Sequence, residues 1–205
     1  MPADFSSLQT LEGHLLSDLA PLTQALNRVE WFVEVAPVVG ASPKLDVTAK
    51  RHRVLFDHTG LVWPCQAVPD ALPFDANSVP AVLLRHAWTP EQTQFPMDQW
   101  ARVIKPGGFL VSVSANPWHP SVWKIMGRRS WRLPSWPHFL SIHAHPDIQL
   151  EMHPLTRWRG GLPKLSPVLV LVGQKRCEIA PIHSRRSGRL ALKHAPAVLA
   201  QCRAA

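Results

Sequence analysis

The chain lacks tyrosine altogether, has three cysteines and has no long apolar run, although it contains nine tryptophans and 21 prolines. No segment reaches the roughly 18 consecutive apolar residues of a membrane-spanning helix, so we expect no transmembrane segment. The cysteines are odd in number and lack the spacing of metal ligands, which fits a protein of the reducing cytoplasm. The start Met-Pro-Ala-Asp is not basic and precedes no apolar stretch, so we expect no secretory signal. Trp and Pro usage without Tyr is typical of a high-GC bacterial genome.

Acidic residues are scarce in the second half of the chain. Residues 116–205 contain 14 Lys or Arg against 3 Asp or Glu, which leaves +11, whereas residues 1–115 contain 8 against 11, which leaves −3. A strongly basic half is typical of a protein that binds an anionic partner such as nucleic acid. A solvated surface followed by a basic tail explains it equally, and both interpretations stay open. The hydrophobic fraction of 46% is enough for the core of one domain.

Two segments carry most of the structural information. Residues 79–84 form a short apolar run after a turn at residues 75–78, which is typical of a strand buried on both faces. Residues 99–104 have helical character, and Lys105-Pro-Gly-Gly108 should end that helix with a left-handed glycine. Residues 109–113 then form a second buried strand. Strand, helix, stop and strand predict a right-handed crossover unit.

The remaining elements follow from the same patterns. Leucines near helical spacing predict a helix over residues 6–26, split at Pro21. We expect further strands at residues 31–36, 45–47, 53–56, 148–152 and 166–172, the last antiparallel, and helical patches at 121–129 and 135–142. The chain from Cys177 is rich in Arg, Ser, His and Ala. We therefore expect one domain over residues 1–176 and a basic, flexible tail over residues 177–205.

The two informative segments also resemble a known family. Leu72-Pro-Phe-Asp-Ala-Asn-Ser-Val-Pro-Ala-Val-Leu-Leu84 resembles the "LPF, acidic turn, strand" segment of class I S-adenosyl-L-methionine-dependent methyltransferases, and Ala101-Arg-Val-Ile-Lys-Pro-Gly-Gly-Phe-Leu-Val-Ser-Val113 resembles their "R-V-L-K-P-G-G-x-L" segment. The resemblance implies an α/β fold with a doubly wound, mostly parallel, seven-stranded sheet in three layers. It also implies methyl transfer from S-adenosyl-L-methionine to an unidentified acceptor, with the cofactor at the carboxyl ends of the strands.

The family's cofactor loop, acid-x-Gly-x-Gly-x-Gly, is altered here. The resemblance places Glu34 on the acidic position and Gly40 on the last glycine, whereas Ala36 and Val38 replace the first two glycines. Val38 is β-branched and Pro37 lacks an amide donor. We therefore expect cofactor contacts at Glu34, Ala36 and Gly40, but weak binding; an empty loop, with Glu34 only ending a strand, is the alternative.

The resemblance also assigns residues to the ribose and the adenine of the cofactor. Asp57 closes the second strand, where the family's ribose-binding acid belongs, and Asp46 competes with it. The adenine-binding position falls on Gln66 or, in another register, on Val68. Leu72 or Phe74 would flank the adenine.

His86 and Asn116 follow the fourth and fifth strands, where the family faces the methyl group. A neutral His can accept the proton of an oxygen or nitrogen acceptor, although a lone His in a strand-end loop is also an ordinary surface residue. Five more histidines gather within residues 119–153, and His143-Ala-His145 could place two imidazoles on one face of a strand. With no Cys pair and no His-Glu-x-x-His pattern, we expect no metal site.

Tryptophans and basic residues alternate over residues 118–159. The resemblance makes residues 116–146 a lid over the active site. The same mixture suits single-stranded nucleic acid or an anionic lipid surface. Two functions therefore compete with methyl transfer: a catalytically inactive methyltransferase-like scaffold, and a nucleic-acid-binding module that uses the basic half.

Overall fold

The computed structural model describes residues 20–37, 45–57, 60–68, 71–85, 97–152 and 166–177. The helices are α2 (Ala20–Asn27), α3 (Met97–Val103), α4 (Pro120–Met126), the 3-10 helix η1 (Gly127–Arg132) and α5 (Trp136–His143). The strands are β1 (Trp31–Pro37), β2 (Lys50–Asp57), β3 (Gly60–Trp63), β4 (Val79–Arg85), β5 (Ile104–Ala115), β6 (Ile148–Met152) and β7 (Val168–Lys175). The predictions for the first part of the leading helix, for Gly40, for His86 and for the tail lie outside the described residues.

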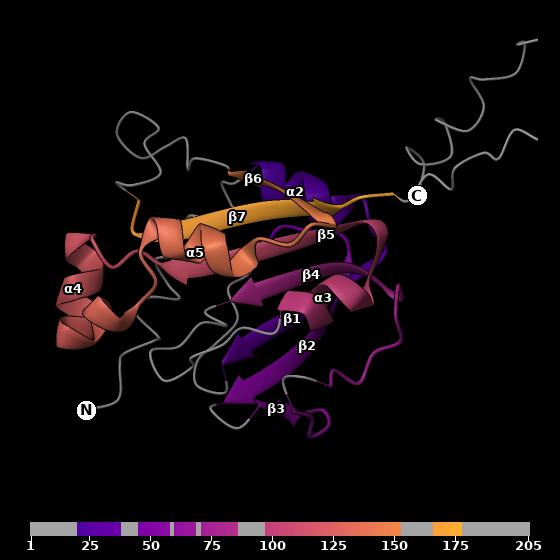
Figure 1. Cartoon of the computed structure of the whole chain (residues 1–205), viewed down its shortest axis with the longest axis horizontal. Helices are drawn as coiled ribbons and strands as arrows, with labels where there is room; N and C mark the ends of the chain where they lie inside the picture. Colours follow the sequence, from indigo (N-terminus) through magenta and orange to yellow (C-terminus); the bar gives the residue numbers. More distant parts are fainter. Residues whose placement is uncertain are drawn as a thin grey trace, which may run out of the picture.

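One seven-stranded sheet contains all of these strands, in the order β3-β2-β1-β4-β5-β7-β6 (Figure 1). The four strands β2, β1, β4 and β5 run parallel to one another. The outer strands β3, β7 and β6 each pair antiparallel. The predicted α/β sheet is therefore confirmed, with a parallel centre and antiparallel strands at both sides.

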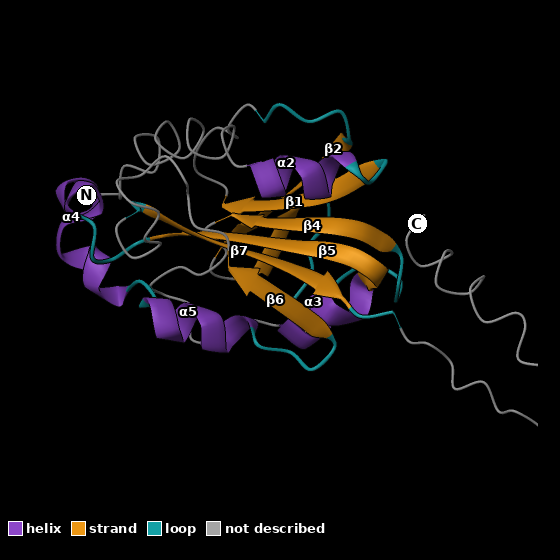
Figure 2. Cartoon of the chain, turned by 90° about the horizontal axis from the view of Figure 1, so that it is seen from above, coloured by secondary structure: helices purple, strands orange, loops and turns teal. Residues whose placement is uncertain are grey.

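Helices cover both faces of this sheet, which explains why its central strands are apolar along their whole length. Figure 2 shows α2 on one face and α3 and α5 on the other. Phe32, Leu83 and Val111 pack with Leu26 of α2, whereas Val33, Val82 and Leu84 pack in the cluster that contains Trp100 of α3. Since side chains alternate between the two faces of a strand, both alternating sets must be apolar. The number of layers in the whole chain stays a prediction.

The second strand is longer than predicted. Residues 45–47 are not a strand, and β2 runs without a break through the basic residues Lys50 to Arg53. These residues pair in parallel register with β1, from Trp31 opposite Lys50 to Glu34 opposite Arg53. Lys50, Arg51 and His52 are exposed. The backbone N–H and C=O groups of these residues are paired with β1, while their charged side chains remain in water. A cluster of charged residues therefore does not by itself indicate the end of a strand.

The sequence patterns also missed β3. This short strand follows β2 directly and pairs antiparallel with it, Asp57 opposite Gly60. A tight hairpin at this position turns the chain back along the sheet edge, where no crossover helix is needed.

The predicted helix stop at residues 105–108 lies inside β5. Helix α3 ends at Val103 and β5 begins at Ile104. Gly107 has φ +76°, the left-handed backbone predicted for a glycine in this segment. The pairing of β4 with β5 shifts register between Val79 and Ala81, opposite this turn of the chain. The helix and the strand are therefore joined without a separate loop.

Candidate functional site

The sheet changes its winding direction at β1. This strand pairs with β2 on one side and with β4 on the other. After β1 the chain adds β2 and β3 on one side of it, and then crosses over to add β4 and the later strands on the other side. Such a switch point opens a crevice at the carboxyl ends of the strands, where doubly wound sheets bind ligands. Pro37, Asp57 and Arg85 are the last residues of β1, β2 and β4, and Asn116 follows β5. Figure 1 shows α4 beyond this same edge of the sheet.

A buried ion pair joins β1 and β4 at the switch point. The Nη1 atom of Arg85 donates to Oε1 of Glu34 at 2.8 Å, and both side chains are 0% exposed. The second carboxylate oxygen of Glu34 lies 3.6 Å from Nη1 of Arg51 on β2. A hydrogen bond between two charges is short and strong where water is excluded. The carboxylate of Glu34 thus joins β1, β2 and β4, and it is not displayed at the strand end.

Two of the predicted cofactor residues, Ala36 of β1 and Asp57 of β2, belong to neighbouring strands at this edge. Ala36 is buried, two residues beyond Glu34 on the same face of the sheet. Pro37 pairs with Phe56, which places Asp57 directly after the last paired position of the two strands. Ala36 and Asp57 therefore lie at or next to the carboxyl ends of two neighbouring strands, and their role toward a cofactor stays a prediction.

Asn116 is held by backbone groups at the carboxyl end of β5. Its Nδ2 donates to the carbonyl of Ser166 at 2.6 Å, and its Oδ1 accepts from the amide of Trp118 at 3.0 Å. The side chain is buried. These bonds fix the turn after β5 to the start of β7, so the position of Asn116 is rigid.

One of the five histidines of residues 119–153 lies next to this turn. His119 is the N-cap of α4, where its Nδ1 accepts from the amide of Ser121 at 3.2 Å. Partial burial lowers the pKa of His119 below its usual value. An acceptor nitrogen and a lowered pKa both favour the neutral imidazole at this edge.

Three other predicted cofactor residues lie elsewhere. Nη2 and Nη1 of Arg102 donate to the carbonyls of Leu72 and Phe74 at 3.2 and 3.1 Å. Arg102 is in the last turn of α3, immediately before β5 begins, so Leu72 and Phe74 lie at the amino edge of the sheet. Leu72 is buried in the core. Gln66 is exposed in the segment after β3.

An open groove of about 930 Å³ lies on the sheet away from the crevice. It is lined by Trp31, His52, Trp63 and Phe74, among others. Trp31 and His52 stand edge to face, with ring centroids 5.5 Å apart. Trp31 begins β1, so this groove is at the amino ends of the strands, opposite the switch point. We do not assign the cofactor to it.

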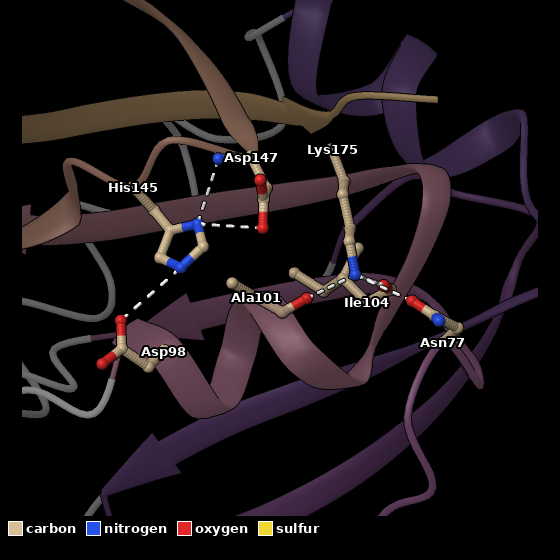
Figure 3. Close-up of polar contacts among 7 residues, drawn as sticks. All are labelled: Asn77, Asp98, Ala101, Ile104, His145, Asp147 and Lys175. Carbon is tan, nitrogen blue, oxygen red and sulfur yellow. Dashed lines mark hydrogen bonds and ion pairs between the residues drawn. The ribbon is translucent and has the colours of Figure 1, made fainter. Parts of the chain in front are cut away.

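The predicted convergence of His143 and His145 on a strand does not occur. His143 is the last residue of α5 and is buried against the carbonyl of Phe139. His145 instead lies between two carboxylates, its Nε2 3.5 Å from Asp98 and its Nδ1 3.8 Å from Asp147 (Figure 3). Within the described ranges no three His, Cys, Asp or Glu side chains are grouped to hold a metal ion. Among the same residues, no helix is long and apolar enough to cross a membrane.

The sequence contains a signal for this ion pair. Glu34 interrupts the apolar run of β1, and Arg85 ends the apolar run of β4. A charged residue in a strand buried on both faces requires a partner of opposite sign. One acid and one base in two such strands therefore indicate that the strands are neighbours.

No protein-family model matches the sequence, and no curated protein matches it. Solved structures are similar in fold. A SAM-dependent methyltransferase from Aquifex aeolicus has a TM-score of 0.53 at 10% identity, over 82% of this chain and 95% of its own. A second, from Thermotoga maritima, has a TM-score of 0.43 at 12% identity, over 83% and 94%. Geranyl diphosphate C-methyltransferase from Streptomyces coelicolor A3(2) has a TM-score of 0.44 at 13% identity, over 83% and 80%.

The Aquifex similarity shows that the chain has the fold of SAM-dependent methyltransferases. The α/β fold with a seven-stranded sheet that the resemblance of residues 72–113 implies is thereby confirmed, although the sheet is mixed and its outer strands pair antiparallel. A fold by itself does not determine an activity.

Proposed function

We propose that the chain binds S-adenosyl-L-methionine at the carboxyl edge of β1, β2 and β4 and transfers its methyl group to an unidentified acceptor. The observation that carries this proposal is the switch point at β1, in a sheet with the fold of SAM-dependent methyltransferases. Ala36 lies near the carboxyl end of β1, and Asp57 ends the neighbouring strand β2. Ligands of doubly wound sheets bind there because no strand or crossover covers the crevice.

The residues at this edge fit the chemistry of the cofactor in part. The carboxylate of Asp57 at the end of β2 would accept the two ribose hydroxyls, and the small side chain of Ala36 allows close approach to the backbone. Gly40 would continue this contact beyond β1. The carboxylate of Glu34 is already bound by Arg85, so we propose Glu34 as a positioning residue that fixes β1 to β4.

The adenine contacts need a different assignment from the one the sequence suggested. Leu72 contributes its side chain to the core and its carbonyl to Arg102, and the carbonyl of Phe74 is bound in the same way. We propose that both residues hold the amino edge of the sheet together. Gln66 is exposed in the segment after β3, away from the proposed cofactor edge, so we do not propose it as the adenine contact.

The remaining residues would act on the acceptor. The cofactor, when bound, supplies a methyl group on a sulfonium that a nucleophile can displace in line. His86, which directly follows β4, would take the proton of an oxygen or nitrogen acceptor. Asn116 would present a fixed surface near the methyl. Residues 116–146 would exclude water from the crevice.

The test is calorimetric titration with S-adenosyl-L-homocysteine. Because the loop after β1 lacks two glycines, we expect a Kd of about tens of micromolar. Asp57→Asn should weaken binding about tenfold or more, since hydrogen bonds to a charged carboxylate are strong. Asp46→Asn is the matched control, an exposed acid before β2 that should leave the Kd unchanged. If Asp46→Asn weakens binding and Asp57→Asn does not, the ribose assignment is wrong.

The second candidate is a methyltransferase-like scaffold without catalysis. The observation that favours it is Pro37, which is buried as the last residue of β1 and offers no amide to a cofactor. The wild-type chain and the Val38→Gly variant would both be titrated with S-adenosyl-L-homocysteine. If both are folded and neither gives binding heat, the result would support the scaffold and exclude methyl transfer.

A further inference from the structure

Three tryptophans form an exposed aromatic cluster beyond the carboxyl edge of the sheet. Trp118, Trp123 and Trp131 are 67%, 44% and 61% exposed. The ring centroids of Trp118 and Trp131 are 6.2 Å apart, and those of Trp123 and Trp131 are 4.8 Å apart. The cluster belongs to α4, η1 and the turn before them, which lie at one end of the molecule (Figure 1).

The helices under this cluster are anchored from the opposite side. Val122 and Met126 of α4 are buried with Ala115 of β5 and Leu133. A short amphipathic element is thus fixed to the sheet by its apolar face, and the indoles project from the other. Exposed side chains of this size, gathered in one place, are typical of an interaction surface.

The charge around the cluster has one sign. Lys124 and Arg128 are exposed beside it. Residues 116–146 contain four Lys or Arg, at positions 124, 128, 129 and 132, and no Asp or Glu. The partner of this surface is therefore anionic as well as receptive to aromatic side chains.

The orientation of the rings favours a lipid surface over a nucleic-acid strand. Successive bases need flat ring faces that are free and presented in sequence. Here Trp118 and Trp131 stand at 72° and Trp123 and Trp131 at 57°, so the rings pack against one another. Trp123 donates its Nε1–H to the carbonyl of Pro117 at 2.7 Å, which satisfies the polar atom before the ring enters an apolar environment. An indole combines a large apolar ring with one polar N–H group, and such side chains are enriched at the headgroup level of bilayers.

We propose that this aromatic and cationic surface, formed by Trp118, Trp123, Lys124, Arg128 and Trp131, docks the protein on an anionic lipid bilayer. The indoles would enter the interface while the cations contact anionic headgroups. The proposal needs no cofactor and no catalysis, so it stands or fails separately from methyl transfer.

The test is co-sedimentation with phosphatidylcholine vesicles, prepared with and without phosphatidylglycerol. The wild-type chain should bind the anionic vesicles and bind the neutral ones far more weakly. Trp118→Ser with Trp131→Ser should weaken binding about tenfold or more. Lys124→Glu with Arg128→Glu should weaken it at least about tenfold, since each cation near the surface contributes about fivefold.

Trp63→Ser is the matched control, because Trp63 is 53% exposed but lies on β3 at the far edge of the sheet. It should bind like wild type, and circular dichroism should show all variants folded. Equal binding of wild type and the Trp118/Trp131 variant would overturn the proposal. So would failure to bind anionic vesicles together with tight binding of a single-stranded oligonucleotide that the same substitutions abolish.

Discussion

Glu34 and Arg85 illustrate how a buried charge depends on partners of opposite sign. Both side chains are fully buried and 2.8 Å apart. Removing water from two charges costs several kcal/mol, which their attraction offsets only when the geometry is good. The pair therefore adds little net stability, but any other register of β1 and β4 would separate the buried Arg85 from Glu34. It acts mainly on the specificity of strand pairing.

His143 is the residue whose titration should be visible in the stability of the protein. Burial lowers its pKa from 6.5 to about 4, although its bond to the Phe139 carbonyl, at 2.7 Å, acts in the opposite direction. The unfolded chain takes up a proton below about pH 6.5, whereas the folded chain stays neutral until about pH 4. Protons thus favour the unfolded state, and the free energy of unfolding should fall as the pH drops through this interval, by up to about 3 kcal/mol from this group.

His143→Leu tests this directly by urea denaturation at a series of pH values. The variant should show a smaller fall in the free energy of unfolding between pH 6.5 and 4 than wild type. His138→Leu, on the exposed side of the same helix, should keep the wild-type slope. An unchanged slope in His143→Leu would show that this imidazole is protonated in the folded protein.

At the scale of elements, the backbone conformation and the close packing at the start of β5 explain why two glycines follow each other there. A Cβ on Gly108 would lie 2.7 Å from the carbonyl oxygen of Pro80 and 2.8 Å from that of Lys105. Gly107, in contrast, has room around it but has φ +76°. The first glycine is required by the backbone angle, and the second by the close approach of β4.

The two glycines should therefore differ in their response to alanine. Gly108→Ala should destabilise the protein by about 2–4 kcal/mol, since backbone atoms must move. Gly107→Ala should cost about 1–2 kcal/mol, the strain of a left-handed residue. Thermal and urea unfolding of both variants measures the difference, and a larger effect at Gly107 would contradict this explanation.

At the scale of the whole molecule, Lys175 ties the last described strand to the rest of the fold. Its Nζ donates to Oδ1 of Asn77 at 2.8 Å, to the carbonyl of Ala101 at 2.6 Å and to that of Ile104 at 2.8 Å (Figure 3). One ammonium thus joins β7, the end of α3, the start of β5 and the turn before β4. A positive charge is favourable at the carboxyl end of a helix.

Lys175→Met should lower the free energy of unfolding by about 1.5–3 kcal/mol, because three acceptors lose a charged donor. Lys124→Met, at an exposed position of α4, should have a negligible effect in the same urea titration. Equal effects of the two substitutions would mean that Lys175 contributes no more than a surface charge.

The sequence by itself determined the central strands and their crossover. The apolar runs of β1, β4, β5 and β7 are local patterns, and a strand buried on both faces leaves that pattern whatever its neighbours are. The predicted antiparallel direction of β7 and the left-handed glycine are confirmed. The sequence also predicted that Ala36 and Asp57 lie at or near strand ends, as they do, because strand ends follow from the same runs; their role in a site stays a prediction.

The tertiary structure alone decided which distant residues meet. The hydrogen bonds of Lys175 join it to Asn77, Ala101 and Ile104, which are 71 to 98 residues away and give no local sign of one another in the sequence. Leu72 and Phe74 lie at the amino edge because Arg102, 28 to 30 residues away, binds their carbonyls. Such contacts depend on how the chain closes over long sequence separations, and that closure is governed by packing of the whole sheet rather than by local residue preference.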